Sequence, residues 1–259
     1  MAPSQLTDLQ SRCDVLRSLH RPGYPLLLPN AWDAATARAV VAAGFPVVAT
    51  GSVAVAAVLG YEDHHAQADA MLAAAARIAN AVKVPVTVDA EAGYGMEPAP
   101  LVAALRSAGA AGCNLEDSDA DHVLGDAGRQ AAWLGAVRQA ASDDRYPLVI
   151  NARVDVFFGP MLAGAEPGSQ RELVAEALER ANAYLEAGAD CVYPIGLWEP
   201  DALRAFMAEV RGPVNLVRLP QAPALTEMAE LGVARVSWGP LLYFDAMARF
   251  TEQLGSLQG

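Results

Sequence analysis

Short apolar runs alternate along the chain with longer segments rich in Ala, Leu and Arg. Continuous apolar runs are typical of parallel strands covered on both faces, and the longer segments have the amphipathic or Ala-rich pattern of helices. The eight predicted strands cover residues 24–29, 45–50, 84–90, 111–117, 146–153, 189–195, 213–217 and 234–238. Predicted helices cover 66–82, 98–108, 126–141, 169–187, 199–209 and 222–231, and a further helix, roughly 5–20, precedes the first strand.

Glycines separate several predicted helices from the next strand, at Gly44, Gly109, Gly188 and Gly232. Glycine is the common residue just past a helix end, because it adopts a left-handed backbone without strain. Eight strand–helix units in about 250 residues are typical of a (β/α)8 TIM barrel. A doubly wound sheet usually has fewer strands, and no GxGxxG follows the first strand. We therefore predict an α/β fold, a (β/α)8 TIM barrel forming a single domain over residues 1–259, with an N-terminal helix.

Composition and charge narrow the function classes. The chain has 53% hydrophobic residues, enough for a sizeable core, and a formal net charge of −12. That excess of acid disfavours nucleic-acid and membrane-surface partners. There is no apolar run of the roughly 20 residues that a membrane span needs, and the N-terminus lacks the order of a signal peptide. The three cysteines form no CxxC pair, which favours a reducing compartment, so we expect a cytoplasmic protein.

Lysine imine chemistry is excluded by the single lysine, Lys83. Schiff-base barrels need a desolvated lysine in the active site, at the carboxyl end of the strands. Lys83 instead stands just before the predicted strand 84–90.

Acidic residues gather where predicted strands end. Asp89 and Glu91 are two residues apart, so on an extended strand they project to the same side, and Glu116 ends the neighbouring strand. Three converging carboxylates repel one another unless a cation is present, and oxygen ligands suit Mg²⁺ or Mn²⁺. The alternative is that some strand-end acids only cap the following helices.

Arg153 ends the fifth predicted strand, across from these acids. A guanidinium binds carboxylate or phosphate in a forked geometry. A metal on one side and Arg153 on the other would suit a small chelating anion, and a 2-oxo acid fits. The alternative is a structural ion pair of Arg153 with Asp155 or Asp117.

These residues make the sequence similar to the isocitrate lyase/phosphoenolpyruvate mutase superfamily over nearly the whole chain. The motifs that carry the resemblance are PNAWDAATA (29–37), LGYED (59–63), DAEAGYG (89–95), LEDSD (115–119), NARVD (151–155) and RVSWGP (235–240). The resemblance implies a (β/α)8 barrel whose C-terminal helix is swapped between subunits of a homodimer or homotetramer. It also implies Mg²⁺ and a 2-oxo-acid or enolate-forming substrate.

The resemblance also assigns roles to particular residues. Asp89, Glu91 and Glu116 match the metal-binding acids, the last acting through water, and Asp63 matches the loop acid near the metal's water shell. Thr50, Gly51 and Ser52 match the loop that binds the substrate carboxylate, Arg153 matches the arginine that contacts substrate, and Asn215 is a weaker match. Trp32 and Tyr94, which lie within two of these motifs, are further candidates for the pocket wall. We therefore treat Asp63, Arg153 and Glu116 as the candidate catalytic residues.

One loop departs from the family pattern. The lyases of the superfamily carry a KKCGH-type loop after the fourth strand, whereas residues 118–130 here contain neither cysteine nor lysine. The loop also lacks the Lys- and Asn-containing pattern of the phosphonomutases. His122 in this loop could donate a proton to an enolate, although a solvent-exposed histidine is the simpler interpretation.

Three functions remain. The first is an Mg²⁺-dependent lyase or decarboxylase that acts on a small 2-oxo (di)carboxylic acid through a metal-stabilised enolate. The second is phosphoenolpyruvate phosphonomutase or phosphonopyruvate hydrolase activity, for which the chain offers few cationic groups. The third is a non-catalytic barrel that binds a 2-oxo acid.

Overall fold

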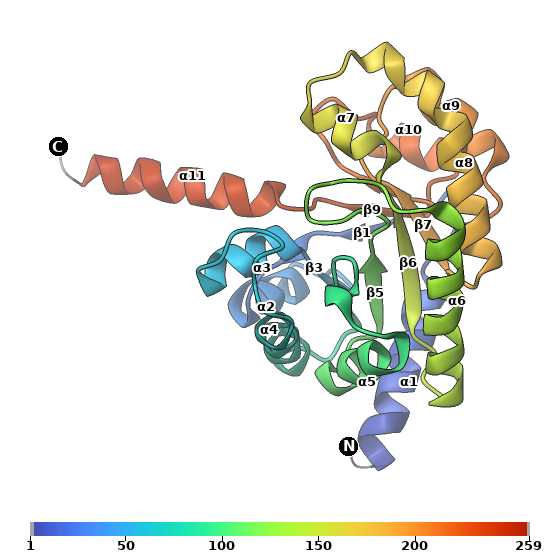
Figure 1. Ribbon diagram of the computed structural model, residues 1–259. Coiled ribbons are helices and arrows are strands. Elements are labelled where there is room, and N and C mark those ends of the chain that lie inside the picture. The colour runs from blue at the N-terminus through green and yellow to red at the C-terminus, as the bar shows by residue number, and fades with distance from the viewer. Residues whose placement is uncertain (1–2, 258–259) are drawn as a thin grey trace.

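Parallel strands lie at the centre of the computed structural model and helices surround them (Figure 1). The structure describes residues 3–257, with side chains from residue 8 onward. The strands are β1 (Leu26–Leu28), β2 (Asn30–Ala31), β3 (Val48–Thr50), β4 (Val86–Asp89), β5 (Gly112–Leu115), β6 (Val149–Val154), β7 (Cys191–Pro194), β8 (Asn215–Val217) and β9 (Arg235–Ser237). Every run that the sequence predicted as a strand overlaps one of these elements, and β2 lies outside the predicted runs.

The strands pair in two parallel sheets. One has the order β2-β3-β4-β5-β6-β7 and the other β1-β9-β8. Between β1 and β2 lies only Pro29, which has no N–H to donate to a neighbouring strand. At the other boundary between the two sheets, an isolated parallel bridge connects Val192 of β7 with Val214, the residue before β8. The predicted parallel α/β fold is thus confirmed, whereas the strands hydrogen-bond as two sheets and not as one closed sheet.

Helices follow the strands, and those over 34–42, 52–59 and 158–162 lie outside the predicted helical segments. The helices are α1 (Pro3–Ser18), α2 (Ala34–Ala42), α3 (Ser52–Leu59), α4 (Ala68–Ala81), α5 (Pro98–Ala108), α6 (Ala127–Asp143), α7 (Phe158–Leu162), α8 (Gln170–Glu186), α9 (Pro200–Glu209), α10 (Leu225–Glu230) and α11 (Leu241–Ser256). Gly44, Gly109, Gly188 and Gly232 all have positive φ, between 77° and 108°, as their places at helix ends predicted.

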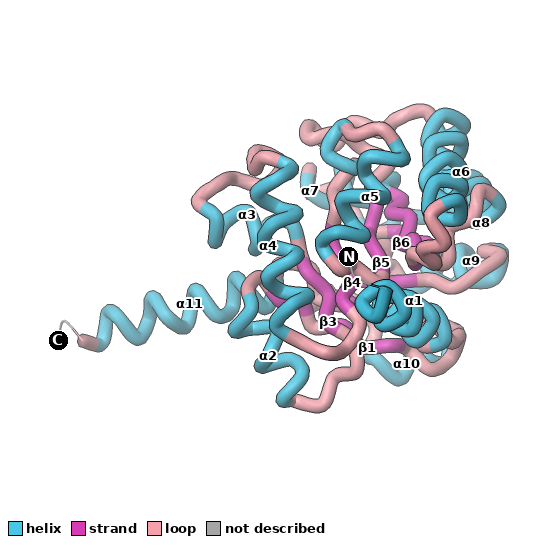
Figure 2. The backbone as a smooth tube through the Cα atoms, turned by 90° about the horizontal axis from the view of Figure 1, so that it is seen from below, coloured by secondary structure: helices cyan, strands magenta, loops and turns pink. Residues whose placement is uncertain are grey.

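Helix α1 lies across the end of the molecule where the strands begin (Figure 2). Its side chains Cys13 and Leu16 are fully buried. Leu16 fits against Gly112, where an added Cβ would come within 2.8 Å of the leucine. Arg17 donates to the carbonyl of Pro147, at 3.1 Å, and to Asp190, at 2.8 Å. This end is therefore closed, which leaves the carboxyl ends of the strands for a site.

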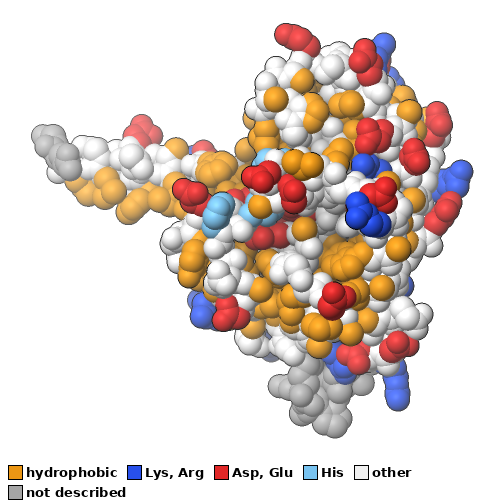
Figure 3. All heavy atoms as spheres, viewed as in Figure 1, with side chains coloured by type: hydrophobic (Ala, Val, Ile, Leu, Met, Phe, Trp, Pro, Cys, Tyr) orange, Lys and Arg blue, Asp and Glu red, His pale blue; other side chains and the backbone are white. Residues whose placement is uncertain are grey.

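Helix α11 projects away from the rest of the protein (Figure 1), and none of its residues is buried. Apolar side chains are exposed along it (Figure 3), including Phe244, Met247, Phe250 and Leu254. Within residues 3–257, none of the helices is both long enough and apolar enough to cross a membrane.

Candidate functional site

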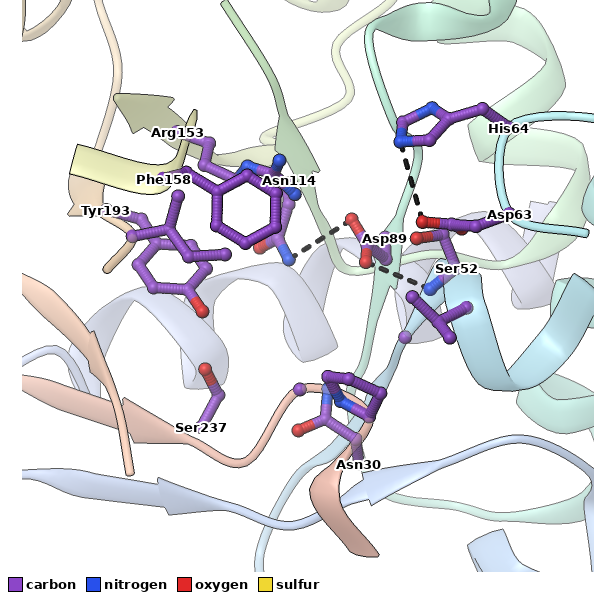
Figure 4. Close-up of a pocket in the computed structure, with 15 residues that line it drawn as sticks. Asn30, Ser52, Asp63, His64, Asp89, Asn114, Arg153, Phe158, Tyr193 and Ser237 are labelled. Carbon is purple, nitrogen blue, oxygen red and sulfur yellow. Dashed lines mark hydrogen bonds and ion pairs between the residues drawn. The ribbon is translucent and has the colours of Figure 1, made fainter. Parts of the chain in front are cut away.

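A cavity of about 100 Å³ opens at the carboxyl ends of the strands (Figure 4). Barrel enzymes build their active sites at this end. Five of the predicted site residues line it: Gly51, Ser52, Asp63, Asp89 and Arg153. The other lining residues are Asn30, Val53, His64, Asn114, Phe158, Tyr193, Ile195, Ser237, Gly239 and Pro240.

Asp89 is held in the cavity by its neighbours on three elements. Its Oδ2 accepts a hydrogen bond from the backbone N–H of Ser52 at 3.0 Å, at the first residue of α3. Its backbone N–H donates to Thr50 Oγ1 at 2.9 Å, and Asn114 Nδ2 lies 3.5 Å from its Oδ1 (Figure 4). Since Asp89 and Asn114 are paired across β4 and β5, strand register fixes the position of the carboxylate.

Three acids surround the imidazole of His64 beside the cavity. His64 Nδ1 lies 3.5 Å from Glu91 Oε2, and its Nε2 lies 3.5 Å from Asp63 Oδ2 and 3.8 Å from Glu116 Oε2. The side chains of His64, Glu91 and Glu116 are 9%, 6% and 0% exposed. Hydrogen bonding to Glu91, with support from the nearby Glu116 and Asp63 charges, raises the pKa of His64 to about 9 despite its burial.

Three carboxylate oxygens in this group accept no hydrogen bond. Among the described side chains, Asp63 Oδ1, Glu91 Oε1 and Glu116 Oε2 are buried without a hydrogen bond. Buried carboxylate oxygens are costly unless paired or bound to a cation, so this donor set fits a hard divalent ion such as Mg²⁺ or Mn²⁺. As the side chains of residues 8–257 are arranged, however, no three acids, histidines or cysteines form a ready metal cluster.

Arg153 lines the cavity and is also fully paired within the protein. Its Nε and Nη2 donate to the two carboxylate oxygens of Asp155 at 2.6 and 2.7 Å, and its Nη1 donates to Glu116 Oε1. Its guanidinium carbon lies 5.0 Å from the centre of the Phe158 ring. Burial opposes the charge, but the Asp155 and Glu116 carboxylates outweigh it and raise the pKa of Arg153. Thus both predicted roles, cavity residue and structural ion pair, coexist in one side chain.

Burial raises the pKa of Glu116, and the nearby Arg153 charge lowers it only in part. Glu116 is the most enclosed of the candidate acids, and its backbone N–H donates to the carbonyl of Glu91 at 2.9 Å. That hydrogen bond keeps the two acids adjacent although they come from different strands. A carboxyl with a raised pKa at a cavity is a common feature of functional sites.

Four other predicted residues lie behind or beside the cavity. Thr50 supports Asp89, and the Tyr94 hydroxyl donates to the Asp89 carbonyl at 3.2 Å. Asn215 is fully buried and donates to Ser237 Oγ at 3.2 Å. The Trp32 ring packs edge-on against Tyr243, with ring centres 5.3 Å apart. These side chains support the site and do not line it.

Asn114 was not predicted as a site residue. Its Oδ1 accepts from Asn151 Nδ2 at 2.9 Å and from Arg235 Nη2 at 3.1 Å, which turns its amide N–H toward Asp89. The sequence carried a signal for it, because Asn114 is two residues before Glu116 and alternate strand residues share a face. Asn151 begins the NARVD motif, but its contact with Asn114 depends on the pairing of β5 with β6.

Backbone strain concentrates here. Of the described non-glycine residues with positive φ, four stand at this site: His64, Glu91, Tyr94 and His122, at 60°, 49°, 56° and 60°. Such conformations cost about 1–3 kcal/mol each and cluster at functional sites. The His122 ring, from the loop before α6, lies 5.9 Å from the His64 ring and 5.1 Å from Phe158. His122 is therefore near two residues of the cavity wall, although it does not line the cavity itself.

Parallel strands with helices outside, and an acid-rich cavity at the carboxyl ends of the strands, define the class of α/β enzymes with barrel-like folds. The chain matches the family described as phosphoenolpyruvate phosphomutase over residues 16–258, so it belongs to that family, within the isocitrate lyase/phosphoenolpyruvate mutase superfamily. It is 36% identical over 227 residues to an uncharacterized protein of Mycobacterium tuberculosis, covering 87% of this chain and 81% of that one. It also resembles the crystal structure of a candidate phosphonomutase from Burkholderia cenocepacia, with a TM-score of 0.88, 42% identity and coverage of 96% and 99%.

Two further relatives have names that state a chemistry. Oxaloacetate decarboxylase 2 of Pseudomonas fluorescens is 28% identical over 218 residues, covering 80% of this chain and 70% of that protein. A phosphonopyruvate hydrolase, solved with oxalate and Mg²⁺, shares the fold, with a TM-score of 0.79, 23% identity and coverage of 95% and 87%. The superfamily thus contains lyases, decarboxylases and phosphorus–carbon enzymes.

Proposed function

We propose that this protein is an Mg²⁺-dependent carbon–carbon lyase of the decarboxylase type, which acts on a small 2-oxo (di)carboxylic acid such as oxaloacetate. The observation that carries the proposal is the small cavity at which Asp89, Arg153 and the first residues of α3 meet, beside three buried acid oxygens that accept no hydrogen bond. We place this activity in a single (β/α)8 barrel domain over residues 1–259. Mn²⁺ is the alternative cation, because it takes the same oxygen ligands.

The cavity suits a small anion. The Arg153 guanidinium faces it from one side, and Gly51 and Ser52 face it from the N-terminus of α3, where backbone N–H groups favour negative charge. A volume of about 100 Å³ favours an acid of a few carbon atoms over a larger metabolite. Phe158 and Ile195 complete the wall with apolar surface, which limits water around the bound acid.

Decarboxylation of oxaloacetate breaks the bond between C3 and the C4 carboxylate. The electron pair moves toward the 2-keto oxygen, CO2 leaves, and a proton from water later adds at C3 to give pyruvate. Asp89, with Glu91 and Glu116, would hold a divalent cation whose positive charge stabilises the enolate oxygen. No side chain has to donate a proton while the bond breaks, which agrees with a loop 118–130 without cysteine.

Proton NMR tests the proposal directly. We expect the purified protein to consume one acid from a panel of 2-oxo acids only when Mg²⁺ or Mn²⁺ is present, with the products identified in the same spectrum. Line broadening of an acid without turnover would instead favour the third function, a barrel that binds 2-oxo acids without catalysis. No binding and no turnover across the panel would contradict the proposal.

Phosphonomutase or phosphonopyruvate hydrolase activity is the second candidate, favoured by the similarity to the Burkholderia protein. Phosphoryl transfer needs cationic groups around the phosphorus. Arg153 is the lining guanidinium among the described residues, and it is already paired with Asp155 and Glu116. Phosphorus-31 NMR that shows conversion of phosphonopyruvate would support this candidate over the decarboxylase.

We also propose that α11 packs on a second copy of this chain, in a homodimer or homotetramer. The support is an apolar helix that buries none of its residues within its own chain. Pro240, which precedes α11, lines the cavity, so the position of the helix bears on the site.

A further inference from the structure

Arg235 is a buried arginine without a partner acid. It is the first residue of β9 and is 1% exposed. The other two buried arginines of the described chain, Arg153 and Arg180, each contact at least one carboxylate. No described acid forms an ion pair with Arg235, its Nε is buried without a hydrogen bond, and burial lowers its pKa. A buried charge of this kind is unfavourable for folding, and such costs are typical of functional sites.

The guanidinium reaches from one sheet to the other beneath the cavity. Strand β9 belongs to the β1-β9-β8 sheet, whereas β5 belongs to the six-stranded sheet. Arg235 Nη2 donates to Asn114 Oδ1 on β5 at 3.1 Å, and Nη1 lies 3.5 Å from His20 Nε2. Asn114 lines the cavity, and so does Ser237, which shares a face of β9 with Arg235. Arg235 itself is not in the lining, so it lies one layer below the cavity floor.

An arginine at this position determines which way the Asn114 amide points. A guanidinium carries only donors, so the Asn114 oxygen has to face Arg235, and the amide nitrogen then faces Asp89 Oδ1, at 3.5 Å (Figure 4). Asn151 Nδ2 also donates to the Asn114 oxygen, at 2.9 Å. An amide can present either a donor or an acceptor, however, and Asn151 Oδ1 is buried without a hydrogen bond. Asn151 alone would therefore allow both orientations of Asn114.

We infer that Arg235 is a positioning residue of this site, which holds Asn114 so that its amide N–H groups face Asp89 and an anion bound in the cavity. The inference rests on the proposed function, because it assumes that the cavity binds a 2-oxo acid. Without Arg235, Asn114 can turn its oxygen toward the Asp89 carboxylate and the anion, so a repulsion replaces an attraction. Loss of one hydrogen bond to a charged group weakens binding by about tenfold to a hundredfold.

The test is binding of oxalate to the full chain with Mg²⁺ at one fixed pH, measured by titration calorimetry. Oxalate is a planar dianion with the size and charge of the enolate of a small 2-oxo acid. Arg235→Met, which offers no donor, should bind oxalate at least about tenfold more weakly than wild type. Arg235→Lys keeps a group with donors only and should bind within about threefold of wild type. Arg211→Met is the control and should bind as wild type does, because Arg211 is 70% exposed.

A double-mutant cycle with Asn114→Ala separates positioning from a direct effect of the Arg235 charge on the anion. If Arg235 acts through Asn114, Arg235→Met should cause no further loss of oxalate binding in a chain that already carries Asn114→Ala. Losses that add in the double variant would overturn the inference, because Arg235 would then act without Asn114.

Thermal unfolding separates positioning from a purely structural role. Arg180→Met removes the guanidinium from the buried Asp117 and should lower Tm. Arg235→Met leaves no carboxylate without its partner and should lower Tm less than Arg180→Met does. An equal loss of Tm in the two variants would make Arg235 a structural residue and overturn the inference.

Failure of the inference can be distinguished from failure of the proposed function. Unchanged oxalate binding in Arg235→Met would overturn the inference and leave the proposed function intact. If wild type neither binds oxalate nor consumes a 2-oxo acid, the proposed function fails and the inference fails with it. If wild type consumes a 2-oxo acid without binding oxalate, KM for that acid replaces Kd in the same comparison. If Arg235→Met does not fold, Arg235→Gln replaces it, because an amide also leaves Asn114 free to turn.

Discussion

Arg153 carries three hydrogen bonds to two buried acids, and this arrangement makes it sensitive to substitution. Replacement by Met keeps the apolar stem but removes the guanidinium from both Asp155 and Glu116, and leaves Glu116 with the His64 imidazole at 3.8 Å. Loss of one member of a buried ion pair costs about 3–5 kcal/mol. We expect Arg153→Met to lower the free energy of unfolding by about that amount, as measured by urea denaturation.

Arg211→Met is the matched control, because Arg211 pairs with Glu186 at 2.8 Å while both side chains are about 70% exposed. An exposed pair contributes about 0–1 kcal/mol, so this variant should be close to wild type. An equal loss of unfolding free energy in the two variants would contradict the claim that the buried ion pairs of Arg153 stabilise the fold.

His20 gives a pH-dependent prediction away from the site. Burial, with help from the Arg235 charge, lowers the pKa of His20 to about 4, and Nε2 lies 3.5 Å from Arg235 Nη1. The unfolded chain therefore binds more protons than the folded one between about pH 4 and 6.5, so stability falls as the pH falls through that window. Wild type should lose about 2 kcal/mol more than His20→Gln between pH 7 and pH 5. If denaturation shows that the free energy of unfolding changes with pH in the same way in both proteins, the prediction for His20 is wrong.

At the residue scale, the sequence could predict which acids stand at strand ends but not how they pair. Asp89 and Arg153 were identifiable because period-two alternation and strand-end position are local features. The contacts of Asn114 and His64 depend on strand register and on a left-handed backbone at His64, which no local pattern specifies. Long-range pairing of this kind can be found only once the fold is known.

At the scale of elements, apolar runs and glycine positions predicted the strands and most helices. Both patterns come from burial and helix ends, which are local consequences of the sequence. One strand break and three helices were not predicted. The break at Pro29 divides the first strand into β1 and β2, and α7 (Phe158–Leu162) is a short helix inserted after β6; both are too short to show a period. The helices α2 and α3 were also missed.

Helix α11 supplies the prediction at this scale. Phe250 is 53% exposed on a helix without buried residues. A charge on an apolar face that packs on another copy has to be desolvated, which weakens association. We expect Phe250→Glu to shift the protein toward a smaller species in analytical ultracentrifugation.

Glu252→Lys, a charge change on the same exposed helix, is the control and should keep the wild-type size. If Phe250→Glu has the same sedimentation as wild type, the proposed contact between copies through α11 is wrong.

At the scale of the whole molecule, the placement of charge and the arrangement of the two strand ends both bear on the site. The chain carries a net charge of −12 and yet gathers buried acids around one cavity, next to the buried Arg153. The two ends of the strands are built differently. Helix α1 covers the end where the strands begin, and the cavity opens at the end where they finish. The family and the class of fold followed from sequence motifs, whereas the choice among lyase, mutase and binding functions depends on chemistry that must be measured.

The most direct measurement of the central claim is metal-dependent turnover by Asp89→Asn, using the 2-oxo acid that wild type consumes. Asp33→Asn is the control, because Asp33 is also a strand-end acid but caps α2 through the Thr36 N–H, a role that Asn also fills. We predict that wild type and Asp33→Asn turn over the acid only with Mg²⁺ or Mn²⁺, and that Asp89→Asn loses at least about 100-fold in kcat/KM. Turnover by Asp89→Asn at the wild-type rate, or wild-type turnover that is indifferent to the metal, would contradict the claim that these acids form a metal-dependent catalytic site.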